Sequence, residues 1–238
     1  MSVPTTSAST DSASVQEPTT SVQVLPGYSF DSRSQAKCGS VSPPPYRIID
    51  LPMIFFSLKL KFSSPLMRSA NLYDQLDIRS VENNLPLYLF NKCYFDNTTC
   101  TFALINSYTN QIVVKATEDI SHLDAFTIEH SHPPSVVLKS ASVFRCIYKF
   151  TWNSHALRWS FDGADLVCVL QSVDPSGKRV NRSVGGIEID SRYRETCTLG
   201  KVWIFQRMVK DIFQDDRFEQ IFLVTAALVM ERAGLLKI

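Results

Sequence analysis

The sequence predicts a mainly β domain, a closed antiparallel barrel of about 12 strands around a central hydrophobic α-helix at the C-terminal side. Three observations lead to this fold. Apolar and polar residues alternate along most of the chain from Leu51 to Phe205, as is typical of half-buried strands. Turn-forming residues separate the alternating segments. A later segment is apolar on every side, unlike an ordinary surface helix.

Residues 1–45 differ in composition from the rest of the chain. They are rich in Ser, Thr and Pro, and their few apolar residues show no sustained period. Such a segment cannot bury enough apolar surface to offset the loss of backbone entropy. We therefore expect 1–45 to be a disordered tail, either a solvated extension or a phosphorylatable regulatory arm. Residues 46–238 are expected to form the barrel domain.

The segment from Phe56 to Phe62 shows the alternation most plainly. Its even positions are apolar and point one way, whereas Lys59 and Lys61 point the other way. The same pattern predicts further strands at 85–90, 101–105, 112–116, 136–139, 144–152, 156–161, 166–171, 178–182, 186–189 and 201–205.

Short turns connect the predicted strands. Turn-forming residues occupy 108–111 and 161–164, and Asp174-Pro175-Ser176-Gly177 matches a type I turn followed by a left-handed glycine. Strands joined by such short turns are antiparallel. No convincing helical period interrupts them, which disfavours a parallel sheet with crossover helices.

The C-terminal segment is predicted to be a helix of about 17 residues and about 26 Å. Every residue from Ile221 to Met230 except Thr225 is apolar. Asp216 with Glu219 resembles a capping box, and Gly234 suits a C-terminal cap. The residues predicted to form the structural core of this helix are Phe218, Ile221, Phe222, Val224, Leu228 and Val229.

A helix that is apolar all round must be surrounded by protein or enter a membrane. A membrane span needs about 20 apolar residues, and here Glu231 and Arg232 follow the apolar run directly. Enclosure is therefore favoured over a tail anchor, and no transmembrane segment is expected. A helix about 10–12 Å across needs more strands around it than the eight that fill their own interior.

Composition and charge restrict the classes of function. The formal net charge of the 238 residues is +1, so the chain has no strong field for a nucleic acid, and no nucleic-acid partner is expected. The N-terminal residues resemble neither a secretory signal nor a transit peptide. We therefore expect a cytoplasmic protein whose six cysteines are thiols.

Several segments resemble the tubby C-terminal-like superfamily, which also includes LURP-one-related proteins and phospholipid scramblases. They are 157–159 with 165–168, the hairpin 172–180, 199–202 and the closing segment 218–232. More specifically, the chain is similar to uncharacterised fungal members over the region from Pro45 onward. The resemblance implies a twelve-stranded barrel around a central hydrophobic helix. For tubby proteins proper, it also implies binding of phosphoinositide headgroups at the inner membrane leaflet.

The tubby signature blocks and the calcium-binding segment of scramblases are not found in this chain, so lipid binding rests on the likeness of fold alone. Two groups of cations are candidate headgroup contacts. The first group, which follows a tight turn, consists of Lys178, Arg179 and Arg182. These side chains either form hydrogen bonds to phosphate oxygens or belong to an ordinary solvated hairpin. The second group is Lys59 and Lys61, which share one strand face. They either bind headgroups or protect the sheet from aggregation.

No catalytic residue, metal or cofactor is expected, because the motifs of hydrolases, zinc proteases and phosphate-binding loops do not occur. We predict a non-enzymatic binding or adaptor module whose partner is an anionic lipid or a protein. It would attach reversibly to anionic phospholipid headgroups as a peripheral protein at the inner membrane face. The alternative is a hollow β-barrel that acts as a small-molecule carrier or enzyme, with an open cavity lined by His130, His132 or Cys146.

Overall fold

The computed structural model describes residues 53–62, 75–94, 100–118, 125–131, 135–142 and 146–236. The predicted tail, 1–45, lies outside these residues, as does the start of the predicted domain, 46–52. The strands are β1 (Met53–Lys61), β2 (Gln75–Ser80), β3 (Pro86–Tyr94), β4 (Cys100–Asn106), β5 (Ile112–Glu118), β6 (Ala125–His130), β7 (Val136–Ser142), β8 (Ile147–Trp152), β9 (His155–Asp162), β10 (Asp165–Val173), β11 (Arg179–Ile189) and β12 (Thr198–Phe205). The helical elements are α2 (Tyr193–Thr196), the π-helix η1 (Met208–Phe213) and α3 (Arg217–Arg232).

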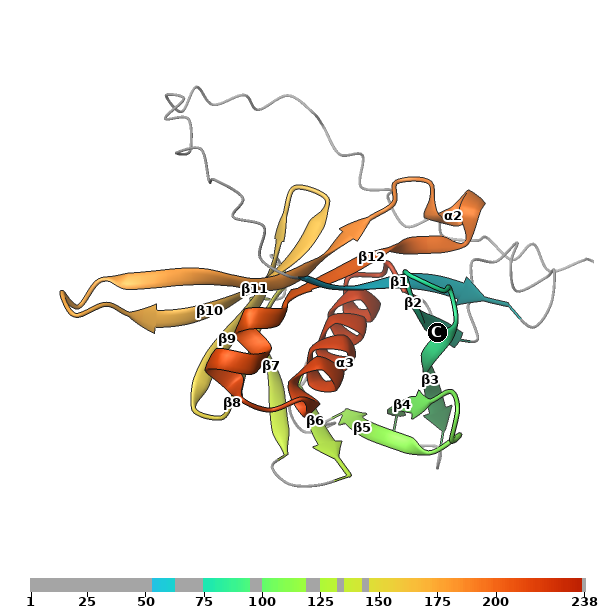
Figure 1. The fold of residues 1–238 in the computed structure, drawn as a ribbon, viewed down its shortest axis with the longest axis horizontal. Helices are drawn as coiled ribbons and strands as arrows, with labels where there is room; N and C mark the ends of the chain where they lie inside the picture. Colours follow the sequence, from blue (N-terminus) through green and yellow to red (C-terminus); the bar gives the residue numbers. More distant parts are fainter. Residues whose placement is uncertain are drawn as a thin grey trace, which may run out of the picture. The chain divides into compact units, whose positions relative to one another are not determined.

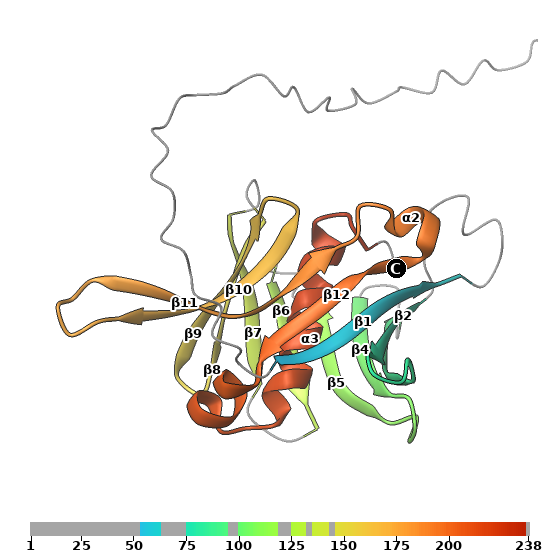
Figure 2. The same cartoon turned by 45° about the horizontal axis from the view of Figure 1, so that its top comes forward.

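The strands form a closed barrel. Each strand pairs with its neighbours in sequence, and β1 pairs antiparallel with β12 to close the ring. Figure 1 shows α3 in the middle of this ring. The predicted fold class is therefore confirmed. The end of the barrel at which α3 begins is called the lower end, because it lies at the bottom of Figures 1 and 2, and the opposite end is the upper end.

The apolar surface of α3 is buried on all sides. Every residue from Ile221 to Met230 is buried, as is Phe218. The predicted core residues Phe218, Ile221, Phe222, Val224, Leu228 and Val229 have exposed fractions of 1% or less. The central polar residue, Thr225, has its own partners: its Oγ1 accepts a hydrogen bond from Trp159 Nε1 (3.0 Å) and donates one to Phe222 O (3.0 Å).

A glycine on β11 lets α3 approach the barrel wall closely. A Cβ atom on Gly185 would lie 2.8 Å from Phe222 Cζ and 2.4 Å from Trp203 O, closer than real contacts allow. Phe222 also packs against Trp159, with the ring centroids 4.7 Å apart. The barrel wall therefore packs closely around Phe222, because Gly185 leaves room for its ring and Trp159 contacts it.

The two ends of α3 differ in how well the sequence predicted them. Gly234 (φ 72°) ends the helix as expected, since its N–H bonds Glu231 O and the N–H of Leu235 bonds Met230 O. The predicted capping box is wrong, because the side chain of Asp216 makes no capping hydrogen bond. Asp215 accepts the backbone N–H of Arg217 at 3.0 Å instead.

The strand predictions need two corrections. β2 and β6 were not predicted, because each buries neighbouring residues instead of alternate ones: Leu76, Asp77 and Ile78 in β2, and Ala125 and Phe126 in β6. The segments predicted at 178–182 and 186–189 are parts of one strand, β11. The predicted gap, 183–185, lies inside this strand, where Gly185 pairs with Ile204 of β12.

Replacing Leu228 by Asp is expected to unfold the barrel domain. Leu228 is fully buried, and an uncompensated charge at such a site costs on the order of 3–5 kcal/mol or more, against a typical total stability of about 5–15 kcal/mol. Thermal unfolding followed by circular dichroism measures the loss. Val173→Asp is the matched control, because Val173 is 65% exposed. A Leu228→Asp protein that melts like the wild type would contradict the internal position of α3.

Candidate anion-binding face

The three cations predicted at the β10–β11 hairpin do not form one cluster. The hairpin extends away from the barrel in both views (Figures 1 and 2). Lys178, Arg179 and Arg182 are all exposed. Arg179 pairs with Val173 and Arg182 with Leu170, positions that lie on opposite faces of the two strands. Arg179 and Arg182 therefore cannot hold the same phosphate group.

The tip of this hairpin is an ordered turn with its own carboxylate. Asp174 Oδ1 accepts hydrogen bonds from Ser176 N and Lys178 N, both at 2.9 Å. The Ser176 hydroxyl, followed by the backbone N–H of Lys178, holds the pKa of Asp174 below its ordinary value. The side chain is therefore an anion at neutral pH, and it offsets the charge of Lys178.

The second predicted pair, Lys59 and Lys61, lies beside a buried carboxylate. Lys59 is opposite Asp77 in the β1–β2 register. Lys61 Nζ lies 3.2 Å from Asp77 Oδ2, which also binds Arg79 at 2.9 Å. Asp77 has no exposed surface, so it needs these cations as partners. Lys61 is thus engaged within the protein.

Three other cations lie side by side on the outer face of the barrel. Lys139 on β7 is directly opposite Lys149 on β8, and Lys149 is directly opposite Arg158 on β9. Adjacent strands are about 4.8 Å apart, so the row spans about 10 Å. We call Lys139, Lys149 and Arg158 the cationic row.

The register of the cationic row follows from the β8–β9 turn. Asn153 and Ser154 both have positive φ values, 45° and 67°. This is typical of the type I′ turn that joins two antiparallel strands by two residues. The turn places Trp152 opposite His155 and, three residues further along each strand, Lys149 opposite Arg158.

Toward the β10–β11 hairpin the surroundings of the cationic row are neutral, whereas exposed Glu129 lies on β6, on the other side of β7. The described outward positions between this row and the hairpin carry Thr151, Ala156, Val169, Gln171 and Asn181, with no carboxylate among them. Like charges directly opposite each other destabilise a sheet. The row is thus an arrangement whose stability a bound anion would increase.

Two hollows lie along this face. The larger, of about 720 Å³, is lined in part by Lys139, Ser140 and Lys149. The smaller, of about 220 Å³, is lined by Lys149, Gln171, Ser172, Val173, Arg179 and Asn181. Lys149 and Gln171 belong to both hollows, so the cationic row and Arg179 share a continuous surface. Arg158 Nε is buried and has no hydrogen-bond partner within the described part of the chain.

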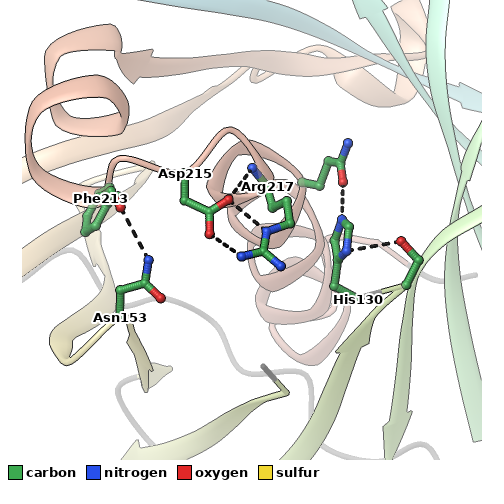
Figure 3. A network of polar contacts seen from close by, with 7 residues as sticks. His130, Asn153, Phe213, Asp215 and Arg217 are labelled. Carbon is green, nitrogen blue, oxygen red and sulfur yellow. Dashed lines mark hydrogen bonds and ion pairs between the residues drawn. The ribbon is translucent and has the colours of Figure 1, made fainter. Parts of the chain in front are cut away.

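A second polar cluster lies at the lower end of the barrel and fixes the start of α3 (Figure 3). His130 Nε2 donates to Gln220 Oε1 at 2.6 Å, and Gln220 Nε2 donates to Tyr88 OH at 3.3 Å. Arg217 binds Asp215 through Nε (2.8 Å) and Nη2 (2.7 Å). These contacts join α3 to β3 and β6, which indicates a structural role.

Glu219 is the acid at the lower end whose pKa is shifted most. Burial and the nearby charge of Asp216 raise the pKa of Glu219 from 4.5 to about 7. Burial also raises the pKa of the Tyr88 hydroxyl; the hydrogen bond from Gln220 opposes this shift, and the charge of Glu219 adds to it. Glu219 is therefore close to half-protonated in the folded protein at neutral pH.

The upper end of the barrel holds a balanced set of charges. Arg232 pairs with Glu118 on β5, and Lys92 on β3 lies 3.7 Å from Glu231. Arg232 also lies over the ring of Phe126, 4.8 Å from its centroid. Because each cation has a carboxylate partner, this cluster attaches the end of α3 to the wall and leaves no net charge for a ligand.

The residues that would mark a hollow barrel do not line an internal cavity together. His130 is bonded to Gln220, Cys146 is partly buried, and His132 lies outside the described residues. Within those residues, no group of three or more His, Cys, Asp or Glu side chains could hold a metal ion.

Comparisons with known proteins identify no relative: no family model, curated protein or solved structure matches the chain. Of the helices in the described residues, none has the length and apolar character needed to cross a membrane.

Sequence reasoning missed the cationic row, although part of the signal was present. Lys149 and Arg158 are equidistant from Asn153–Ser154, so recognising the two-residue turn would have paired them. The position of Lys139 depends on the β7–β8 register, which contains an irregularity between Ser140 and Ser142. Alternation within a strand cannot reveal such a shift.

Glu219→Gln is expected to change how stability depends on pH. The folded state holds the Glu219 proton up to pH about 7, whereas the unfolded chain releases it near 4.5. Stability should therefore fall as pH rises from about 4.5 to about 7, and the amide should remove this fall. At pH 8 the variant should be more stable by up to about 3 kcal/mol. Urea unfolding at several pH values measures this, and equal slopes for both proteins would contradict it.

Proposed function

We propose that this chain is a non-enzymatic binding module that attaches reversibly to anionic phospholipid headgroups, with the cationic row as its main contact. The observation that carries the proposal is the direct cross-strand alignment of Lys139, Lys149 and Arg158 on a face without intervening carboxylates. The width of the row, about 10 Å, suits a headgroup with several phosphates, such as a phosphoinositide. Charge-assisted hydrogen bonds to phosphate oxygens would provide most of the affinity.

The apolar residues of the same face support a membrane rather than a soluble anion as the source of the phosphate. Val137 and Val173 are 42% and 65% exposed. They lie on the outward side of β7 and at the end of β10, close to the cations. A surface that combines exposed apolar residues with lysine and arginine is typical of proteins that bind at a membrane interface.

The fold supports the proposal by analogy. A twelve-stranded barrel with a helix in its lumen is what the resemblance to the tubby C-terminal-like superfamily implies, and headgroup binding at the inner leaflet is a property of tubby proteins. A cytoplasmic protein that is peripheral at that leaflet fits this function. The alternative, a hollow carrier or enzyme, needs an open lumen, and α3 occupies that space with buried side chains.

Co-sedimentation with lipid vesicles tests this function. The protein should sediment with phosphatidylcholine vesicles that contain phosphatidylinositol bisphosphate, and less with pure phosphatidylcholine. Each cation near an anionic membrane contributes about 1 kcal/mol, so Lys149→Ala should weaken binding about five-fold. Binding should also weaken as salt is raised.

Lys61→Ala is the matched control for Lys149→Ala, because Lys61 is a lysine on an outward strand position that pairs with Asp77. It should bind vesicles like the wild type. A third arm adds soluble inositol hexakisphosphate, which should compete if the phosphates are recognised. Equal sedimentation with both kinds of vesicle, or full binding by Lys149→Ala, would overturn the proposed function.

A further inference from the structure

The ladder between β7 and β8 ends before either strand does. It joins Lys139 to Lys149, Ser140 to Tyr148 and Ser142 to Ile147. The antiparallel order would continue with Leu138–Phe150, Val137–Thr151 and Val136–Trp152, yet these described residues do not pair. The two strands diverge toward the lower end in both views (Figures 1 and 2). We call this opening, between 136–138 and 150–152, the β7–β8 split.

The hydrogen-bonding groups that face the split can be identified from the β8–β9 turn. In a two-residue hairpin, the pair that flanks the turn, here Trp152 and His155, is hydrogen-bonded. The backbone groups of Thr151 therefore point away from β9 and toward β7. Val137 holds the corresponding position on β7, two residues from Lys139. The N–H and C=O groups of Val137 and Thr151 thus line the split as two strand edges that have no ladder partner among the described residues.

The split opens into the larger hollow of this face. That hollow, of about 720 Å³, is lined by Val136, Val137, Phe150 and Thr151 among others. Val136, Phe150 and Leu157 line the hollow, are buried and form an apolar floor. Ser140 Oγ is buried without a hydrogen-bond partner among the described residues. Lys139 and Lys149 stand where the two strands come together.

We propose that the β7–β8 split binds an extended peptide in which acidic and apolar residues alternate. An extended strand is the ligand whose backbone can pair with the unpaired groups of Val137 and Thr151. Because β7 and β8 run in opposite directions, the peptide is antiparallel to one edge and parallel to the other. Its inward side chains rest on the apolar floor, and its outward side chains lie beside Lys139 and Lys149, so the latter are acidic.

This inference goes beyond headgroup binding and assigns the adaptor activity to a separate set of atoms. The peptide requires the backbone edges of the split, whereas a headgroup requires only the cations of the face. Lys139 and Lys149 serve both ligands, so peptide and membrane exclude each other. The module would then exchange a protein partner for an anionic lipid surface.

A fluorescent hexapeptide of alternating Glu and Val is the probe, and anisotropy measures its binding to the full chain. The matched peptide of alternating Lys and Val should bind at least ten-fold more weakly. The Glu-Val peptide with N-methyl groups on its backbone keeps the charge but cannot pair as a strand. Its affinity for the protein should also be at least ten-fold lower. Equal binding of the N-methylated peptide would overturn the proposal.

Hydrogen exchange locates the peptide on the protein. With saturating peptide, the amides of Val137 and Thr151 should exchange at least ten-fold more slowly, while that of exposed Val173 should not change. Val137→Pro removes one edge donor and should abolish peptide binding, with Val137→Ala as the control that keeps the donor. Circular dichroism confirms that the proline variant folds; if it does not, the N-methylated peptide decides. Unchanged exchange at Val137 and Thr151 would also overturn the proposal.

The two proposals fail separately. The N-methylated peptide, which cannot pair with the split, should leave binding to phosphoinositide vesicles unchanged, whereas the Glu-Val peptide should reduce it. Lys149→Glu should lose both ligands. Vesicle binding without peptide binding would remove the inference and leave the proposed function. Peptide binding without vesicle binding would remove the proposed function and leave the inference. Simultaneous binding of peptide and vesicles by one protein would contradict their mutual exclusion.

Discussion

The all-round burial of α3 is the constraint on which the rest of the structure depends. A helix with ten consecutive buried positions, Ile221 to Met230, cannot rest on an open sheet, because one side would remain in water. The closed ring of strands supplies apolar contacts at every angle around it. The one polar side chain in that stretch, Thr225, is tolerated because Trp159 and Phe222 complete its hydrogen bonds.

Polar contacts at the two ends set the position of the helix along the barrel. Apolar packing alone is non-directional and would allow a helix to slide or rotate. His130 and Tyr88 hold Gln220 at the lower end, and Glu118 and Lys92 hold Arg232 and Glu231 at the upper end. Because these partners come from β3, β5 and β6, the same side of the wall fixes both ends. The face formed by β7 to β11 is left to carry the cationic row and the split.

Sequence reasoning predicted the barrel because the signals for it are local. Alternation and turn residues act over a few positions, and the apolar run of α3 is continuous. The errors have equally definite causes. The predicted gap at 183–185 lies inside β11, where Gly185 makes room for Phe222 of α3, a contact between distant segments. At the start of α3, Asp215 rather than Asp216 accepts a backbone N–H, directly after the left-handed Gln214 that ends η1.

The candidate site was harder to predict than the fold because it depends on register. The hairpin cations Lys178, Arg179 and Arg182 are neighbours in sequence but are divided between two faces. Lys139, Lys149 and Arg158 are distant in sequence but aligned across three strands. Cross-strand alignment requires the turn lengths and bulges to be known, and composition does not contain them.

The order of elements along the chain affects how this protein can be made. The ring closes only when β12 meets β1, and α3, which fills the ring, follows β12. A ribosome therefore delivers all the strands before the segment that completes their interior. Until then, the inner faces of the strands remain in contact with water. Pairing between such distant segments is slow, so productive folding has to wait until α3 has left the exit tunnel.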